Sequence, residues 1–172
     1  MKHPDRSMPE VLRELLALEF DYAEGNGMDF EPYSAFLPEA DTRSWIQAWT
    51  GNTELSGEEY LIFGQDGTGG YAAIWCTRVG KELLDQPIVF LGSEGEMGVV
   101  AQDFSSFLWL LAGGFGPLEA VMYPGEKREP DATFTEFAER HAGNARIQPD
   151  DVLANARREF PTFEADVRAS CR

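Results

Sequence analysis

Hydrophobic residues recur along the chain in two rhythms, and helices are predicted where apolar side chains return every three or four positions. The first such stretch covers residues 11–20 and follows Ser7 and Glu10, which resemble a helix capping box. A second helix is predicted to begin near Asp41 and to end at Gly51, with its tryptophans facing the core. The N-terminal part of the chain is therefore expected to be helical.

Four short apolar runs, rich in aromatic and branched residues, predict β-strands. The segment GQDGTGG joins the first two runs, and the segment SEGE joins the last two. Glycine-rich connections of this kind are typical of β-hairpins, so two hairpins are expected. The four runs cover residues 60–63, 71–75, 87–92 and 97–101.

Helices are predicted again after the last strand. Asp103 is expected to cap a strongly apolar helix that ends at Gly113 and Gly114, and a polar linker over residues 123–131 follows it. Further helices are predicted from a Thr133 capping box, at Pro149 and after Pro161. This order of elements predicts an α+β fold, with a mixed or antiparallel sheet of four to six strands flanked by helical N- and C-terminal segments. The side chains expected to be buried together are Trp45, Trp49, Trp75, Phe90, Phe107 and Leu108.

The charge of the chain says more about its binding partners than its composition does. The chain has 172 residues, of which 43% are hydrophobic, as expected for one globular unit. Its net charge is −16, and between Glu10 and Asp66 there are 13 acidic residues against only Arg13 and Arg43. Such a field repels nucleic acids and anionic membranes and attracts cationic partners. The alternative interpretation is a charge that serves solubility alone.

Catalytic and cofactor motifs are absent from the sequence. Phosphate and dinucleotide loops open a helix, whereas a strand is predicted after the glycines of Phe63–Trp75, and Asp66 alone does not make a calcium loop. These glycines are interpreted as turn residues that take positive φ. The two histidines and two cysteines are too dispersed for a zinc site or a catalytic triad. No catalytic residue, cofactor or metal is therefore predicted, although a pair of hydrolytic carboxylates stays open as an alternative.

Cellular location is predicted from three features of the sequence. Cys76 and Cys171 form no disulfide pattern, the N-terminus has no apolar signal segment, and no apolar run approaches the length of a membrane span. Together they predict a cytoplasmic protein.

Two segments resemble the central core of the SUKH superfamily, in its SMI/KNR branch. They are FGQDGTGGYAAIW and PIVFLGSEGEMGVVAQDFSSFLWLLAGG. The resemblance covers residues 58–114 and lies in the order of the parts: a hairpin, an aromatic strand, a strand ending in Leu-Gly-x-x-Gly, a further strand and a helix. The N-terminal Leu-Pro of the family is present at Leu37, but its Asn-Gly has only an approximate counterpart at Gly51. The resemblance places a SUKH-like domain at 1–122 and a helical C-terminal extension, packed on it, at 123–172.

The resemblance implies a non-catalytic protein-binding domain. Bacterial members are commonly immunity proteins that neutralise a cognate toxin, and fungal members regulate cell-wall synthesis and signalling. Combined with the charge, it implies a cationic protein partner, such as a nuclease toxin with a basic active site. A housekeeping regulator or scaffold, and a hydrolase that uses acidic residues, are the alternatives. The acidic residues expected to bind the partner precede the first hairpin or occupy the hairpin tips: Glu54, Glu58, Glu59, Asp66, Glu94 and Glu96.

Overall fold

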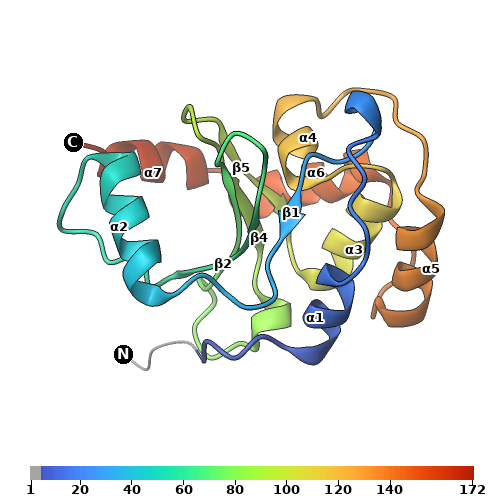
Figure 1. Ribbon diagram of the computed structural model, residues 1–172, viewed down its shortest axis with the longest axis horizontal. Helices are drawn as coiled ribbons and strands as arrows, with labels where there is room; N and C mark the ends of the chain where they lie inside the picture. The colour runs from blue at the N-terminus through green and yellow to red at the C-terminus, as the bar shows by residue number, and fades with distance from the viewer. Residues whose placement is uncertain (1–4) are drawn as a thin grey trace.

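Helices cover both faces of a five-stranded sheet in the computed structural model, which describes residues 5–172 (Figure 1). The strands lie side by side in chain order, and every neighbouring pair is antiparallel. This arrangement confirms the predicted α+β fold and shows that the sheet is antiparallel. The strands are β1 (Glu31–Pro32), β2 (Tyr60–Gln65), β3 (Tyr71–Trp75), β4 (Ile88–Leu91) and β5 (Met97–Ala101).

Both predicted hairpins are present. Residues 66–70 join β2 to β3, and residues 92–96 join β4 to β5. Because Tyr71 at the start of β3 pairs with Leu91 at the end of β4, the two turns lie at the same end of the sheet. That end is the upper one in Figure 1, and it holds the candidate site.

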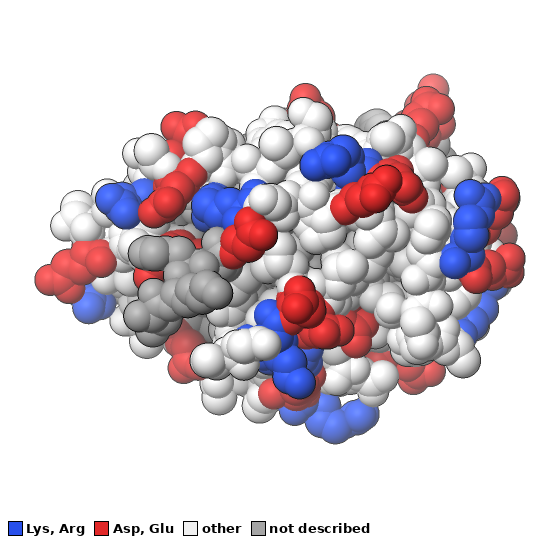
Figure 2. Space-filling model, turned by 90° about the horizontal axis from the view of Figure 1, so that it is seen from below, with Lys and Arg blue, Asp and Glu red and all other residues white. Residues whose placement is uncertain are grey.

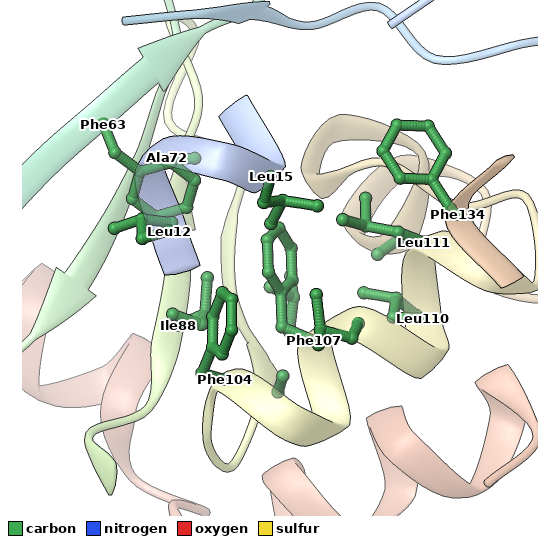
Figure 3. Close-up of a cluster of buried hydrophobic side chains, with 14 of the residues drawn as sticks. Leu12, Leu15, Phe63, Ala72, Ile88, Phe104, Phe107, Leu110, Leu111 and Phe134 are labelled. Carbon is green, nitrogen blue, oxygen red and sulfur yellow. The ribbon is translucent and has the colours of Figure 1, made fainter. Parts of the chain in front are cut away.

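The first of two cores lies between one face of the sheet and a layer of helices, three of which provide most of its helical side chains. Figure 3 shows Leu12, Phe104 and Phe107 beside Phe63 and Ile88 of the sheet, with Phe134 on the other side of the same cluster. Phe107 is fully buried at the centre of the cluster. Asp103 starts the central helix by accepting a hydrogen bond from the Ser106 N–H at 2.8 Å, as predicted. The helices are α1 (Glu10–Leu16), α3 (Phe104–Ala112) and α5 (Ala132–His141).

The second core lies on the opposite face of the sheet, under α2 (Glu39–Thr50) and α7 (Phe163–Ser170). Residues at successive positions of a strand point to opposite faces, so Val89 belongs to this core and its neighbour Ile88 to the first. Helix α6 (Pro149–Glu159) packs along β5 and contributes to both cores.

The prediction that six large side chains are buried together is wrong, because the sheet separates them. Phe90, Phe107 and Leu108 are fully buried in the first core. The three tryptophans pack at the margin of the second core, where they are only half-buried. Trp45 stacks on Trp49 with ring centroids 5.3 Å apart, and the indole N–H of Trp49 donates to the Gly92 carbonyl at 2.7 Å.

Several helix limits differ from the predicted ones. Helix α1 follows Pro9 without a side-chain cap, so the Ser7 capping box is not formed, and the helix ends at Leu16. Helix α2 begins two residues before Asp41, after Pro38, and ends as predicted at Gly51. Helix α5 is capped by Asp131 rather than Thr133. Strand β1 and helix α4 (Pro117–Met122) were not predicted at all.

Residues 123–172 pack against the rest of the chain through both cores. Phe134 of α5 belongs to the first core and Phe163 of α7 to the second. The end of the chain also contacts the loop after α2: the Asn52 side-chain amide donates to the Ser170 carbonyl at 2.8 Å, and the Arg172 N–H donates to the Thr50 carbonyl at 2.9 Å. The C-terminal helices thus complete both layers around the sheet.

Candidate functional site

The two hairpin turns, the loop before β1 and the region of α4 surround a cleft of about 500 Å³. It is of the size that small-molecule and side-chain binding sites commonly have. Each wall comes from a different part of the sequence, so the cleft exists only in the folded chain. Five carboxylates line the cleft: Asp29, Glu94, Glu96, Glu119 and Glu126.

Asp66 organises the first hairpin turn. Its Oδ1 accepts hydrogen bonds from the Thr68 N–H at 2.7 Å, the Thr68 hydroxyl at 2.6 Å and the Gly70 N–H at 3.1 Å. The Thr68 hydroxyl in turn accepts a bond from the Ser93 hydroxyl at 3.0 Å, which joins the two turns. Asp66, which was predicted to bind a partner, is only 1% exposed, and its Oδ1 is engaged within the turn. Its carboxylate serves the turn instead.

The predicted turn is present, but of Gly67, Gly69 and Gly70 only Gly69 has the predicted positive φ. Gly69 has a φ of +92°, a conformation that side chains other than glycine rarely adopt. Gly67 and Gly70 do not have positive φ. Gly70 is required by close packing, because a Cβ there would lie 2.9 Å from both Asp66 Oδ2 and Phe90 Cζ. The segment therefore forms a turn and presents no phosphate loop.

Glu119 lines the cleft from α4 and is 5% exposed. Its Oε2 accepts a hydrogen bond from the Asp29 N–H at 3.2 Å, and the Asp29 Oδ1 accepts one from the Gly67 N–H at 2.9 Å. These bonds tie α4, the loop before β1 and the first hairpin together. Burial raises the pKa of Glu119, and the nearby Asp29 N–H and Arg128 guanidinium oppose that rise only in part. Its Oε1 is buried and has no hydrogen-bond partner among the described residues.

Arg128 is the cleft's one basic residue in the described part of the chain, and its side chain is only 4% exposed. It donates to the carbonyls of Gly114 at 2.7 Å, Asn26 at 3.1 Å and Gly27, and it pairs with Glu126 at 2.9 Å. Its donors are thus engaged within the protein. With five carboxylates against this one guanidinium, the cleft has a formal net charge of −4.

Exposed apolar side chains gather at the same cleft. Four large hydrophobic residues of the described chain are strongly exposed, and three of them line the cleft. They are Tyr22 at 57%, Met122 at 44% and Tyr123 at 53%, whereas the fourth, Val79, lies between β3 and β4. Clustered exposed apolar surface marks interaction sites more often than scattered exposed residues do. The cleft therefore combines negative charge with aromatic surface.

The six acidic residues predicted to bind a partner do not lie together. Glu94 and Glu96 line the cleft, whereas Glu54, Glu58 and Glu59 do not. Glu58 and Glu59 directly precede β2 and so lie at the sheet end opposite the hairpin turns. Glu59 is half-buried, and burial raises its pKa. Figure 2 shows the molecule from below, a side on which acidic and basic side chains are interleaved rather than gathered in one acidic patch.

Sequence reasoning missed most of the residues that form the cleft. One signal was present for Glu119: Pro117 and Glu119 follow Gly116 as the first and third residues of a helix, positions that favour proline and glutamate. Tyr22 and Tyr123 gave no such signal, because only the tertiary fold brings their segments together.

Comparisons of the chain with protein-family models, with curated proteins and with solved structures found no match. Within residues 5–172, no group of three or more histidine, cysteine or acidic side chains is arranged to hold a metal ion. None of the helices in that range is both long and apolar enough to span a membrane. The cleft must therefore be interpreted from its own chemistry, which combines five carboxylates and one paired arginine with exposed aromatic surface.

Proposed function

We propose that the protein is a non-catalytic binding protein of the SUKH type, and that it acts as a cytoplasmic immunity protein by binding a cationic surface of a cognate toxin. The observation that carries the proposal is the cleft at the hairpin turns. Its carboxylates outnumber its single arginine, which is already paired, and its rim exposes Tyr22, Met122 and Tyr123. The resemblance of residues 58–114 to the SMI/KNR branch supports the biological role.

The physical advantage of such a cleft is speed as well as affinity. Opposed charge fields raise the rate of association, and an immunity protein must capture its toxin before damage occurs. The net charge of −16 attracts a cationic toxin at long range, and the carboxylates of the cleft attract its basic groups at contact. A nuclease toxin fits this scheme because its own site must be basic to hold phosphates.

The proposal requires a toxin encoded beside this protein, and stopped-flow association with that toxin tests it. The double variant Glu94→Gln/Glu96→Gln removes two charges from the cleft, and Glu54→Gln/Glu58→Gln removes two charges outside it. At low salt we expect the cleft variant to lose about tenfold in association rate, with a weaker dependence on salt, and the control to lose much less. Equal rates for the cleft variant and the wild type would contradict the proposal.

Two further outcomes point to the alternative functions. A chain that fails to protect cells from the neighbouring toxin, but binds another cationic protein through the cleft, would be a housekeeping regulator or scaffold. Hydrolysis of chromogenic glycosides that is lost in Glu119→Gln would indicate a hydrolase, because a buried carboxyl with a raised pKa is suited to be a general acid.

A further inference from the structure

The buried carboxylate of Glu119 is incompletely hydrogen-bonded. A carboxylate has about four acceptor positions, and the structure supplies one donor to Oε2, the Asp29 N–H, and none to Oε1. Buried acceptors in native proteins are nearly always paired, and leaving one unpaired destabilises the fold. Asp66 Oδ2 is likewise unpaired, but only Glu119 also lines the cleft, where a ligand can bring a donor.

No side-chain or backbone donor within residues 5–172 bonds Oε1. Arg128 is the basic side chain nearest the site, and its guanidinium already bonds three backbone carbonyls and Glu126 while lying over the Phe115 ring. A ligand that brings several N–H donors, such as an organic cation, can supply the donor that Oε1 lacks.

The rim selects among organic cations. Tyr22 and Tyr123 both line the cleft and are more than half exposed. Tyr22 lies in the loop between α1 and β1, and Tyr123 directly follows α4. A guanidinium is planar, stacks on aromatic rings and forms paired bonds with carboxylates, whereas an ammonium is a compact and strongly hydrated point charge. Exposed aromatic rings beside several carboxylates therefore favour arginine over lysine.

We propose that the cleft is an arginine subsite, which receives the guanidinium of one arginine on a surface loop of the partner, with Glu96 and Glu119 as acceptors and Tyr22 and Tyr123 as stacking surfaces. The inference rests on the proposed function and names the group that the site recognises. Asp29 has a positioning role, because its N–H and its carboxylate hold Glu119 and the hairpin turn in place.

Three blocked tripeptides test the subsite without the toxin: acetyl-Gly-Arg-Gly-amide, its lysine counterpart and its citrulline counterpart. Citrulline keeps the shape of arginine and lacks its charge. Binding is followed by amide chemical shifts in ¹H–¹⁵N NMR spectra. We expect saturable shifts at Asp29, Thr68 and Gly95 with the arginine peptide, affinity at least fivefold lower with lysine, and no saturation with citrulline. Equal binding of lysine and arginine, or no saturation with arginine, would overturn the proposal.

Variants separate recognition from a structural role of Glu119. Glu119→Gln keeps an acceptor for the Asp29 N–H and removes the charge, so we expect arginine affinity to fall at least tenfold while the spectrum stays folded. Glu96→Gln, which changes a half-buried carboxylate of the cleft, should weaken binding as well, and Glu54→Gln is the matched control outside it. If Glu119→Gln and Glu96→Gln both bind the arginine peptide as the wild type does, the subsite is wrong.

The same variants distinguish failure of the subsite from failure of the proposed function. In one outcome the toxin binds, Glu94→Gln/Glu96→Gln slows its association, and Glu119→Gln changes neither toxin nor peptide binding. That outcome supports the proposed function and contradicts the arginine subsite. If the arginine peptide binds but the neighbouring toxin does not, the subsite stands and the immunity role falls.

Discussion

At the scale of single residues, Asp66 shows how an acidic residue in an acidic chain can serve the fold alone. Removing its carboxylate leaves the Thr68 and Gly70 N–H groups of the turn without their acceptor. We expect Asp66→Ala to lower the free energy of unfolding by about 2–3 kcal/mol, and Asp66→Asn, which keeps one oxygen, to lower it by less. Urea denaturation measures both variants. Equal stability of Asp66→Ala and wild type would mean that the turn does not need this acceptor.

The glycine at position 69 gives a second prediction for the same turn. A Cβ at Gly69 meets nothing within 4 Å, so the cost of Gly69→Ala comes from its φ of +92° alone and is expected to be about 1 kcal/mol. At Gly70 the cost comes from the Asp66 and Phe90 atoms that a Cβ would crowd, and it is expected to be larger. Thermal unfolding of the two variants ranks them, and the reverse order would contradict this account of the turn.

Titration of Glu119 links the site to pH. Burial raises its pKa above the ordinary value of 4.5, while Asp29 and Arg128 are the charged groups that face it. The folded state holds the proton of Glu119 more tightly than the unfolded state does. This proton binding therefore stabilises the fold at pH below 4.5, and its contribution is lost as the pH rises through the folded pKa. The stability difference between wild type and Glu119→Gln should therefore decrease between about pH 4 and about pH 7. A difference that stays constant with pH would show that Glu119 does not titrate in this range.

At the scale of elements, the sequence predicted best where one local rule decides. Strands β3 and β5 have the predicted limits, because continuous apolar runs bounded by turn residues leave few alternatives. Asp103 at the start of α3 was recognisable for the same reason. Strand β1 was missed because it has two residues and includes Pro32, which cannot donate to a neighbouring strand. Its existence depends on pairing with β2, which is a tertiary contact.

The site was predictable only to the extent that it lies on the hairpins. Glu94 and Glu96 stand in a turn that the sequence reveals, and they line the cleft. Asp29 and Glu119 were missed because they are 90 positions apart in the sequence, and only the fold brings them into hydrogen-bond contact. The sequence also could not divide the aromatic residues between two cores, since a tryptophan on a helix face looks the same whichever side of the sheet the helix covers.

Independence of the two cores is itself a prediction. Phe107 and Phe163 belong to different clusters on opposite faces of the sheet. Phe107→Leu and Phe163→Leu should each destabilise by about 1–2 kcal/mol, and the double variant by their sum to within about 0.5 kcal/mol. Urea denaturation of the three variants gives the coupling. An interaction energy above about 1 kcal/mol would show that the sheet transmits strain between its faces.

At the scale of the whole molecule, the net charge of −16 opposes the compact state through self-repulsion. Raising the ionic strength from about 0.01 M to about 0.1 M shortens the Debye length from about 30 Å to about 10 Å. We therefore expect the unfolding midpoint in urea to rise with sodium chloride over this range. Glu54→Gln/Glu58→Gln should reduce the increase, and a midpoint that falls with salt would contradict the prediction.

The hydrogen bonds of Arg128 also have a consequence for the timing of synthesis. One side chain closes the N-terminal loop at Asn26 and Gly27 against a segment about a hundred positions later. The N-terminus of the chain leaves the ribosome first. Tyr22 and Asp29 therefore cannot form the cleft until α4 and Arg128, which line its other side, have left the exit tunnel. A stalled or truncated chain that ends before Arg128 would carry both hairpin sequences and no finished cleft. Capacity to bind would then mark a chain whose synthesis has passed Arg128.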